Sequence, residues 1–191
     1  MSVDELYYQI YELKERLGIL QEEYWHQTSG PDTWYFWFNI VSVIIPFVLL
    51  YFFLDRGRVF EIGFYGFAIH VMWSNLDNVL SMYNYLITPH SISYLFPTSL
   101  TVTTVVLPIG FMLLYQYCTN KGKNFYLYAI VLSAGFGYGL ASIFIALDML
   151  ILHGGMKLTY IFLLDVAISY LAFWLTKLFW WLKNHGPKKT G

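Results

Sequence analysis

Charged residues are scarce in this 191-residue sequence. They make up 12% of it, whereas a soluble domain carries about 25%. Hydrophobic residues make up 58%, and several runs approach the roughly 20 apolar residues that a helix needs to cross a bilayer core. Too little polar sequence is left to cover a water-soluble surface. The composition therefore predicts an integral membrane protein whose main partner is the lipid bilayer.

Several function classes lack the residues that they require. The only cysteine, Cys118, can form neither a disulfide within the chain nor a cysteine-based metal site. The net charge of −1 provides no overall basic surface for nucleic acid. No P-loop, GxSxG, dinucleotide-binding or CxxC motif occurs. We predict no nucleic-acid partner and can name no cofactor or catalytic residue; an enzyme is less favoured than a non-enzyme.

Residues 1–30 are polar and acidic and lack the basic start and apolar core of a signal peptide, so we expect the helices to drive insertion. Apolar segments follow at about 35–54, 59–87, 98–117, 125–152 and 158–182. We predict an all-α membrane protein with an N-terminal amphipathic helix in 1–30, a bundle of about five transmembrane helices in 34–183, and a basic tail in 184–191. Pro46 and Pro108 lie inside two of the spans and are expected to disturb them.

Basic residues predict the orientation of the chain. Most lie at one set of span ends: Arg56, Arg58, Lys121, Lys123, Lys177, Lys183, Lys188 and Lys189. The other set carries only Lys14, Arg16 and Lys157. Five spans fit this division with the N-terminus outside and the C-terminus in the cytoplasm, which predicts a multi-pass protein of the plasma membrane. The alternative keeps residues 1–30 inside and requires an even number of spans.

The N-terminal segment has a helical pattern. Ser2 and Glu5 are spaced as a capping box. Apolar residues then recur with alternating spacings of four and three, at Leu6, Ile10, Leu13, Leu17, Leu20 and Tyr24. This seam predicts either a helix that packs on the membrane part or lies in the interface, or a short coiled coil through residues 2–24 that joins protomers or a partner protein.

A polar stripe runs along the second span. Its members fall on one helical face: His70, Ser74, Asp77, Asn78, Ser81 and Asn84. A central aspartate facing lipid costs about 3 kcal/mol, so we expect the stripe to face other helices or a wet cavity. The alternative is structural, because such side chains also join helices by hydrogen bonds.

Two more acids lie in the same half of the predicted membrane, Asp148 near the end of the fourth span and Asp165 within the fifth. If the bundle closes, they converge with Asp77 near His70, with no basic residue to neutralise them. Buried carboxylates of like charge repel, so such a site takes up a proton or a cation. We predict an outward-half cavity that binds or moves a cation, a proton or a small polar ligand.

Two alternatives remain. One is a non-catalytic scaffold or complex subunit that uses the N-terminal helix and a glycine face. Gly135 and Gly139 mark that face, which predicts either close packing inside the bundle or a contact with a second protein. The other, less favoured, is a membrane enzyme with Asp77 and His70 as acid and base. Glu61 is expected to form a local ion pair with Arg58.

Histidines offer no strong metal signal. His26, His90 and His153 fall on the predicted outer side, but the sequence has no short ligand spacing such as HExxH. We therefore assign no metal site.

Several residues match a family pattern across about 22–170. They are Glu23-Tyr24-Trp25, Arg58, Glu61, Ile62, Tyr65, Gly66, Asp77 and the segment PIGFMLLYQY, which begins at Pro108 and includes Tyr115 and Gln116. In these residues the chain resembles a family of small five-span membrane proteins of spore-forming Firmicutes. At 148–149 it has Asp-Met where that family has an acid followed by proline. The resemblance implies a bacterial plasma membrane and draws attention to Glu61, Asp77, Tyr115 and Gln116, but it implies no mechanism.

Overall fold

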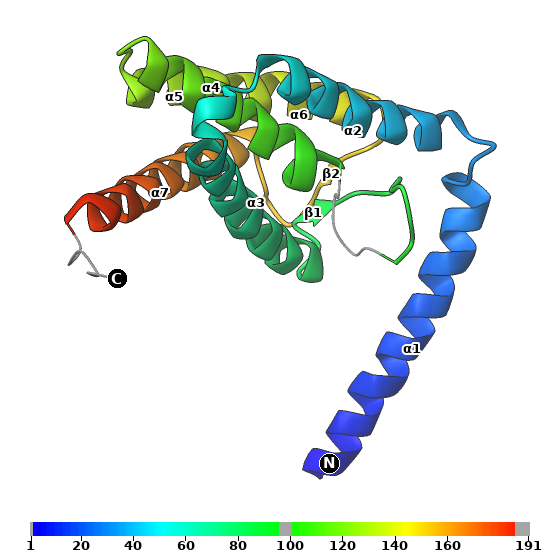
Figure 1. Ribbon diagram of the computed structural model, residues 1–191. Coiled ribbons are helices and arrows are strands. Elements are labelled where there is room, and N and C mark those ends of the chain that lie inside the picture. The colour runs from blue at the N-terminus through cyan, green and yellow to red at the C-terminus, as the bar shows by residue number, and fades with distance from the viewer. Residues whose placement is uncertain (1, 96–100, 186–191) are drawn as a thin grey trace.

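The computed structural model describes residues 2–95 and 101–185, whose regular elements are helices apart from one pair of two-residue strands (Figure 1). The α-helices are α1 (Val3–Thr28), α2 (Trp34–Phe53), α3 (Val59–Met82), α4 (Leu107–Asn120), α5 (Phe125–Ala134), α6 (Ala141–Ala146) and α7 (Leu158–His185). The shorter elements are the 3₁₀ turn η1 (Arg56–Arg58), the π-helical segments η2 (Val102–Val106) and η3 (Gly135–Leu140), and the strands β1 (Leu86–Ile87) and β2 (Ile151–Leu152). The predicted all-α class is confirmed.

Four helices are long and apolar enough to cross a membrane. They are α2, the rod Val102–Asn120, the rod Phe125–Ala146, and α7. Helix α3 has 24 residues, or about 36 Å at 1.5 Å per residue, but its composition leaves it outside that set. Four of the five predicted spans therefore have the required length and composition, and a membrane-spanning role for α3 stays a prediction.

The helices α3, α4, α5 and α7 form a ring, in which each packs against two others, and α2 packs on its edge against η2 and α4. Aromatic side chains fill the ring: Tyr65 stacks on Tyr115 with centroids 4.5 Å apart, and Phe125 stacks on Phe173 at 4.3 Å. Helix α3 has the largest set of buried residues of any helix, whereas α2 buries only Asn39. The helix with the polar stripe is thus central, where neighbours cover it, as the cost of polar groups in lipid requires.

Two predicted spans end earlier than expected. Helix α3 ends at Met82 and α6 at Ala146, not at 87 and 152. Each end is followed by a residue with positive φ, Asn84 at 56° and Asp148 at 58°, a conformation that these two residue types tolerate. The chain then extends, and Leu86 pairs with Leu152 and Ile87 with Ile151 as antiparallel strands. The last carbonyls of the two helices accept from the turns that follow them, Leu80 from the Tyr85 amide and Phe144 from the Met149 amide, each at 2.8 Å.

The π-helical segments change which side chains face inward. Segment η2 directly precedes α4, and Pro108 therefore lies in the first turn of α4 rather than in the middle of a regular helix. In η3, Gly137 packs on α7, because a Cβ there would lie 2.8 Å from the backbone of Phe162. Gly135 and Gly139 are exposed, and a Cβ at either would meet no atom within 4 Å. Their predicted packing inside the bundle was wrong; a contact with a second protein stays a prediction.

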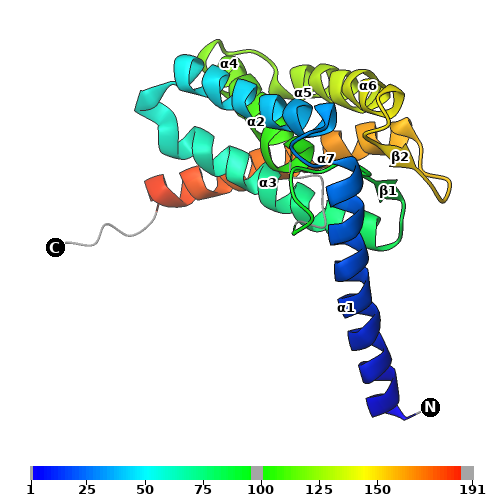
Figure 2. The same ribbon diagram turned by 90° about the vertical axis from the view of Figure 1, so that its right-hand side faces the viewer.

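Helix α1 extends away from the ring and runs crosswise to α2 (Figures 1 and 2). The predicted capping box is present: the Ser2 amide donates to Glu5 Oε2 at 2.7 Å, and the Glu5 amide donates to Ser2 Oγ at 3.2 Å. No residue of α1 is buried. Only its C-terminal end is tied down, where Trp25 Nε1 donates to the Ser91 carbonyl at 2.9 Å. Packing of the whole helix on the membrane part is therefore not observed.

Candidate functional site

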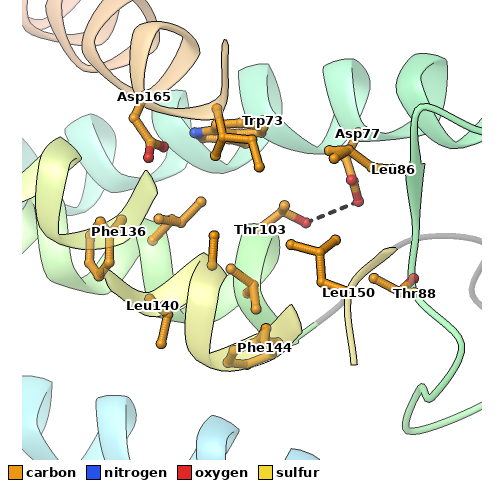
Figure 3. Close-up of a pocket in the computed structure, with 14 residues that line it drawn as sticks. Trp73, Asp77, Leu86, Thr88, Thr103, Phe136, Leu140, Phe144, Leu150 and Asp165 are labelled. Carbon is orange, nitrogen blue, oxygen red and sulfur yellow. Dashed lines mark hydrogen bonds between the residues drawn. The ribbon is translucent and has the colours of Figure 1, made fainter. Parts of the chain in front are cut away.

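A cavity of about 60 Å³ lies inside the helix ring (Figure 3). Apolar side chains form most of its wall, including Phe136, Leu140, Phe144 and Leu150. Both π-helical segments border it, η2 through Val102 and Thr103 and η3 through Phe136 and Leu140. Such segments occur frequently at functional sites, so their meeting at one cavity marks it as the candidate site.

Asp165 projects from α7 into this cavity and is completely buried. Neither of its carboxylate oxygens has a hydrogen-bond partner among the described residues, and neither has the indole nitrogen of Trp73 on α3. The indole nitrogen lies beside the carboxylate and points toward it (Figure 3), so this N–H is a polar neighbour of Asp165. A carboxylate without a partner in apolar surroundings is costly, so this group requires a proton, a cation or a polar ligand.

Asp77 lies on α3 one helical turn beyond Trp73 and is 3% exposed. Thr103 of η2 donates its hydroxyl to Asp77 Oδ2 at 3.4 Å (Figure 3). The two aspartates therefore line one cavity from two helices, α3 and α7. The Asp77 carboxylate accepts a hydrogen bond from Thr103, whereas the Asp165 carboxylate makes none within the described residues.

Among the described residues, no basic side chain lines the cavity. Two carboxylates in one small apolar space repel each other, and a bound proton or cation removes that repulsion. The volume limits the occupant further, because a water molecule needs about 10–15 Å³ of such space. The cavity accommodates a few waters or one small cation, which excludes larger solutes.

The predicted stripe on α3 is only partly directed inward. The buried face of α3 is centred on Tyr65, Ile69 and Trp73, roughly a quarter turn from the centre of the stripe. Asp77 is the stripe residue that this face buries, whereas Asn78 and Asn84 are exposed. The expectation that the whole stripe faces other helices or a cavity was therefore wrong, because the large apolar side chains determine the buried face.

Four other predicted residues lie outside the cavity wall. His70 and Ser74 are half-buried and contact each other, with His70 Nδ1 3.4 Å from Ser74 Oγ, and Ser81 is half-buried one turn beyond Asp77. Asp148 is exposed beyond the end of α6. The structure thus places Asp77 and Asp165 on one cavity, at its two ends with Trp73 between them (Figure 3), but not Asp148 or His70, and the pairing of Asp77 with His70 as acid and base is not formed.

A second polar cluster lies at the opposite end of α3. Arg58 donates to both carboxylate oxygens of Glu61, from Nε at 3.1 Å and from Nη2 at 2.6 Å. It also donates to Thr119 Oγ1 at 2.9 Å and to Asn120, and Tyr115 donates its hydroxyl to Glu61. The predicted local ion pair is confirmed, and its hydrogen bond to Glu61 raises the pKa of Arg58.

Gln116 extends this cluster to the end of α2. Its amide nitrogen donates to the Phe53 carbonyl at 2.7 Å, and its amide oxygen accepts from the Asp55 amide at 2.7 Å. Three of the residues highlighted by the family pattern, Glu61, Tyr115 and Gln116, therefore fasten α4 to the connection between α2 and α3. Their contacts are structural.

The predicted outer histidines do not form a metal centre in the described part of the chain, where no three His, Cys, Asp or Glu residues are grouped to hold an ion. His90 instead stacks on Tyr35, with centroids 3.5 Å apart, and its Nδ1 lies 3.0 Å from Ser29 Oγ. Burial lowers the pKa of His90. This cluster ties the end of α1 to the start of α2.

Sequence reasoning overlooked Trp73. It occupies the cavity wall opposite Asp165 and is 1% exposed. A signal was present, because Trp73 precedes Asp77 by four residues and so shares its helical face.

A scan against protein-family models, a search of curated proteins and a search of solved structures each found no match to this chain. The candidate site therefore depends on its geometry alone, and the family resemblance stays a prediction.

Proposed function

We propose that this chain is a five-span protein of the plasma membrane whose central cavity binds a proton or a small cation at Asp165 and Asp77. The observation that carries the proposal is the Asp165 carboxylate, which is completely buried, faces a cavity and has no hydrogen-bond partner within the described residues. A group in that state is stabilised by an occupant. Movement of the occupant across the membrane would be a further property of the same site.

The proposed topology adds α3 to the four long apolar helices as a further span, second in chain order, with the N-terminus outside. Arg58 contacts the end of α4, so the basic connections around Arg56, Arg58, Lys121 and Lys123 lie at one end of the bundle. The positive-inside rule assigns that end to the cytoplasm. The cavity then belongs to the outer half, because Asp77 lies near the opposite end of α3.

The test is thermal unfolding of the purified protein in sodium, potassium, magnesium and choline salts and across a pH series. A cation that binds the folded state stabilises it by about 2.7 kcal/mol at a concentration 100 times its Kd. We expect one small cation to raise the Tm of the parent but not of Asp165→Asn, with acidification reducing the effect because protons compete.

Asp148→Asn is the matched control. It is the same chemical change at an exposed acid, and asparagine tolerates the positive φ of 58° there. It should respond to each salt as the parent does. If the occupant is a proton, no cation acts and the pH dependence of Tm differs between the parent and Asp165→Asn. Identical responses of all three proteins to every salt and pH would disprove the proposal.

A further inference from the structure

An open groove of about 330 Å³ lies between the start of α3 and the end of α7, at the basic end of the bundle. Arg58, Phe60 and Glu61 form one side, and Thr176, Trp180 and Lys183 form the other. The three residues from α7 are spaced by four and three, so they share one helical face. The groove is separate from the central cavity and shares no lining residue with it.

The net charge of this groove is positive. The negative charge of Glu61 is balanced by Arg58, and its carboxylate also accepts a hydrogen bond from Tyr115. Lys183 has no hydrogen bond or ion pair with any described residue, and so it adds a positive charge that nothing balances. The guanidinium of Arg58 is fixed in place by the contacts with Glu61 and Thr119, so it is oriented before any ligand arrives.

The rest of the groove is aromatic and faces outward. Phe60 is 92% exposed and Trp180 is 54% exposed, and Phe64 packs against Phe179 with centroids 5.0 Å apart. Tryptophan near helix ends is typical of the level of lipid headgroups. Basic groups above an apolar wall at that level match an anionic headgroup with its acyl chain below, and such pockets between membrane helices bind anionic lipids.

We infer that this groove binds an anionic phospholipid, with the phosphate at Lys183 and Arg58 and an acyl chain along Phe60 and Trp180. This inference rests on the membrane setting of the proposed function but not on the cavity. The test measures the affinity of the detergent-purified protein for phosphatidylglycerol and phosphatidylcholine, from the Tm of mixed micelles. Inorganic phosphate is added separately.

Phosphatidylglycerol should raise the Tm of the parent, and phosphatidylcholine and phosphate should not. Lys183→Gln should weaken the apparent affinity about fivefold, since one basic group near a charged lipid is worth about 1 kcal/mol. Lys121→Gln is the control, a lysine at the same end of the bundle but outside the groove. Equal losses in both variants would show diffuse attraction to the basic end, and stabilisation by phosphate alone would show a free anion; either result overturns the inference.

A second inference comes from α1, where the apolar seam and the charges are arranged around one axis. At 100° per residue, all six acids lie about 100° or more from the centre of the seam; they are Asp4, Glu5, Glu12, Glu15, Glu22 and Glu23. Lys14 and Arg16 lie about 80° from it, one on each side. Basic residues flanking an apolar stripe can reach headgroups while their stems lie on lipid.

The C-terminal end of α1 shows which way the seam faces. Leu20 and Tyr24 line a groove together with Pro89 and Tyr94, so the seam there faces the end of the bundle from which α2 starts. Helix α1 continues crosswise beyond the ring (Figures 1 and 2). A helix that runs across the bundle end, with its seam facing the bundle, follows the plane of the membrane surface.

We infer that α1 lies on the outer membrane surface with its seam in the lipid interface. The single native thiol allows a clean test, because Cys118 is 1% exposed and labels poorly in the folded protein. An environment-sensitive fluorophore is attached to Leu13→Cys on the seam, or to Glu15→Cys on the acidic face, in phosphatidylcholine vesicles. The unmodified parent is the blank.

The label at position 13 should be blue-shifted and quenched by a lipid-soluble quencher, and the label at 15 should be quenched by aqueous iodide. A disulfide-linked dimer formed by Leu13→Cys, but not by Glu15→Cys, would show that the seam pairs two copies of the chain instead. Iodide quenching at both positions would also overturn the inference.

Discussion

Two acids that face opposite ends of α3 differ in their hydrogen bonding: Glu61, half-buried on α3 itself, and Asp165, completely buried on α7. Glu61 accepts hydrogen bonds from Arg58 and Tyr115, and Arg58 is itself tied to Thr119. Asp165, which faces the other half of α3 from α7, makes no hydrogen bond within the described residues, and its polar neighbour is the indole N–H of Trp73. A buried polar group that is fully paired stabilises a structure, whereas one left unpaired costs stability. The cluster of Arg58, Glu61 and Tyr115 therefore has a structural role as a fastening, and the central cavity does not.

The largest expected effect on stability comes from removing Arg58 from its cluster with Glu61 and Tyr115. Arg58→Ala removes the donors to Glu61, Thr119 and Asn120 and leaves a carboxylate without its cation. We expect a loss of about 2–3 kcal/mol in the free energy of unfolding, the range for hydrogen bonds to charged groups, measured by denaturant unfolding. The neighbouring Arg56 contacts the Tyr51 ring at 5.4 Å, and Arg56→Ala should cost under about 0.5 kcal/mol. Equal losses would show that the cluster has no special weight.

A comparison of two glycines tests the wall of the cavity. Gly137→Ala places a methyl group 2.8 Å from the Phe162 backbone, and overpacking of this kind costs about 1–3 kcal/mol. Gly139→Ala meets open space and should be neutral or stabilise the helix by up to about 1 kcal/mol. The measurement is the Tm of both variants beside the parent. A tolerated Gly137→Ala would contradict the close approach of η3 to α7.

The same change at the two acids should have opposite consequences. Glu61→Gln weakens the pairing with Arg58 and should lower stability by more than about 1 kcal/mol. Asp165→Asn removes a charge that has no described partner, so in the absence of added cations it should leave stability within about 1 kcal/mol or raise it. Unfolding is followed by tryptophan fluorescence. Destabilisation of equal size at both positions would mean that Asp165 is held as firmly as Glu61.

The smallest expected effect is a dependence of Tm on pH caused by His90, in the loop before η2. Burial lowers the pKa of His90 from its ordinary 6.5, against an opposing influence of Asp148. The unfolded chain then takes up the proton first, so the stabilising contribution is complete above about pH 6.5 and is lost as the pH falls below it. The Tm of the parent should fall more than that of His90→Gln between pH 7 and 5. A parallel fall would assign the effect to other groups.

The helices could be predicted because long apolar segments need little else to define them. Glu61 and Arg58 were paired correctly because their spacing of three residues on a helix makes them neighbours. The orientation of α3 could not be obtained from its polar residues, since Tyr65, Ile69 and Trp73 have more surface to bury and decide which face turns inward.

Asp148 and the glycines were misplaced for a related reason. Both predictions extended a regular helix through 125–152, but η3 interrupts the regular period and α6 ends at Ala146. A π-helical turn has no strong sequence signal, and the positive φ of Asp148 depends on the strand pair that follows it. Asp165 could be predicted as a site residue because it is an isolated acid within an apolar span. That its carboxylate makes no hydrogen bond became visible only with the side chains of α3 in place.

The pairing of β1 with β2 affects how fast the proposed occupant of the cavity exchanges rather than how tightly it binds. Leu86, Thr88 and Leu150, which belong to or adjoin these strands, form the outer wall of the cavity. If the proposed cation enters from that end, the pairing of Leu86 with Leu152 has to open first. Exchange would then proceed at the rate of this local opening, and the residence time of the ion would be set by the strands rather than by Asp165 and Asp77.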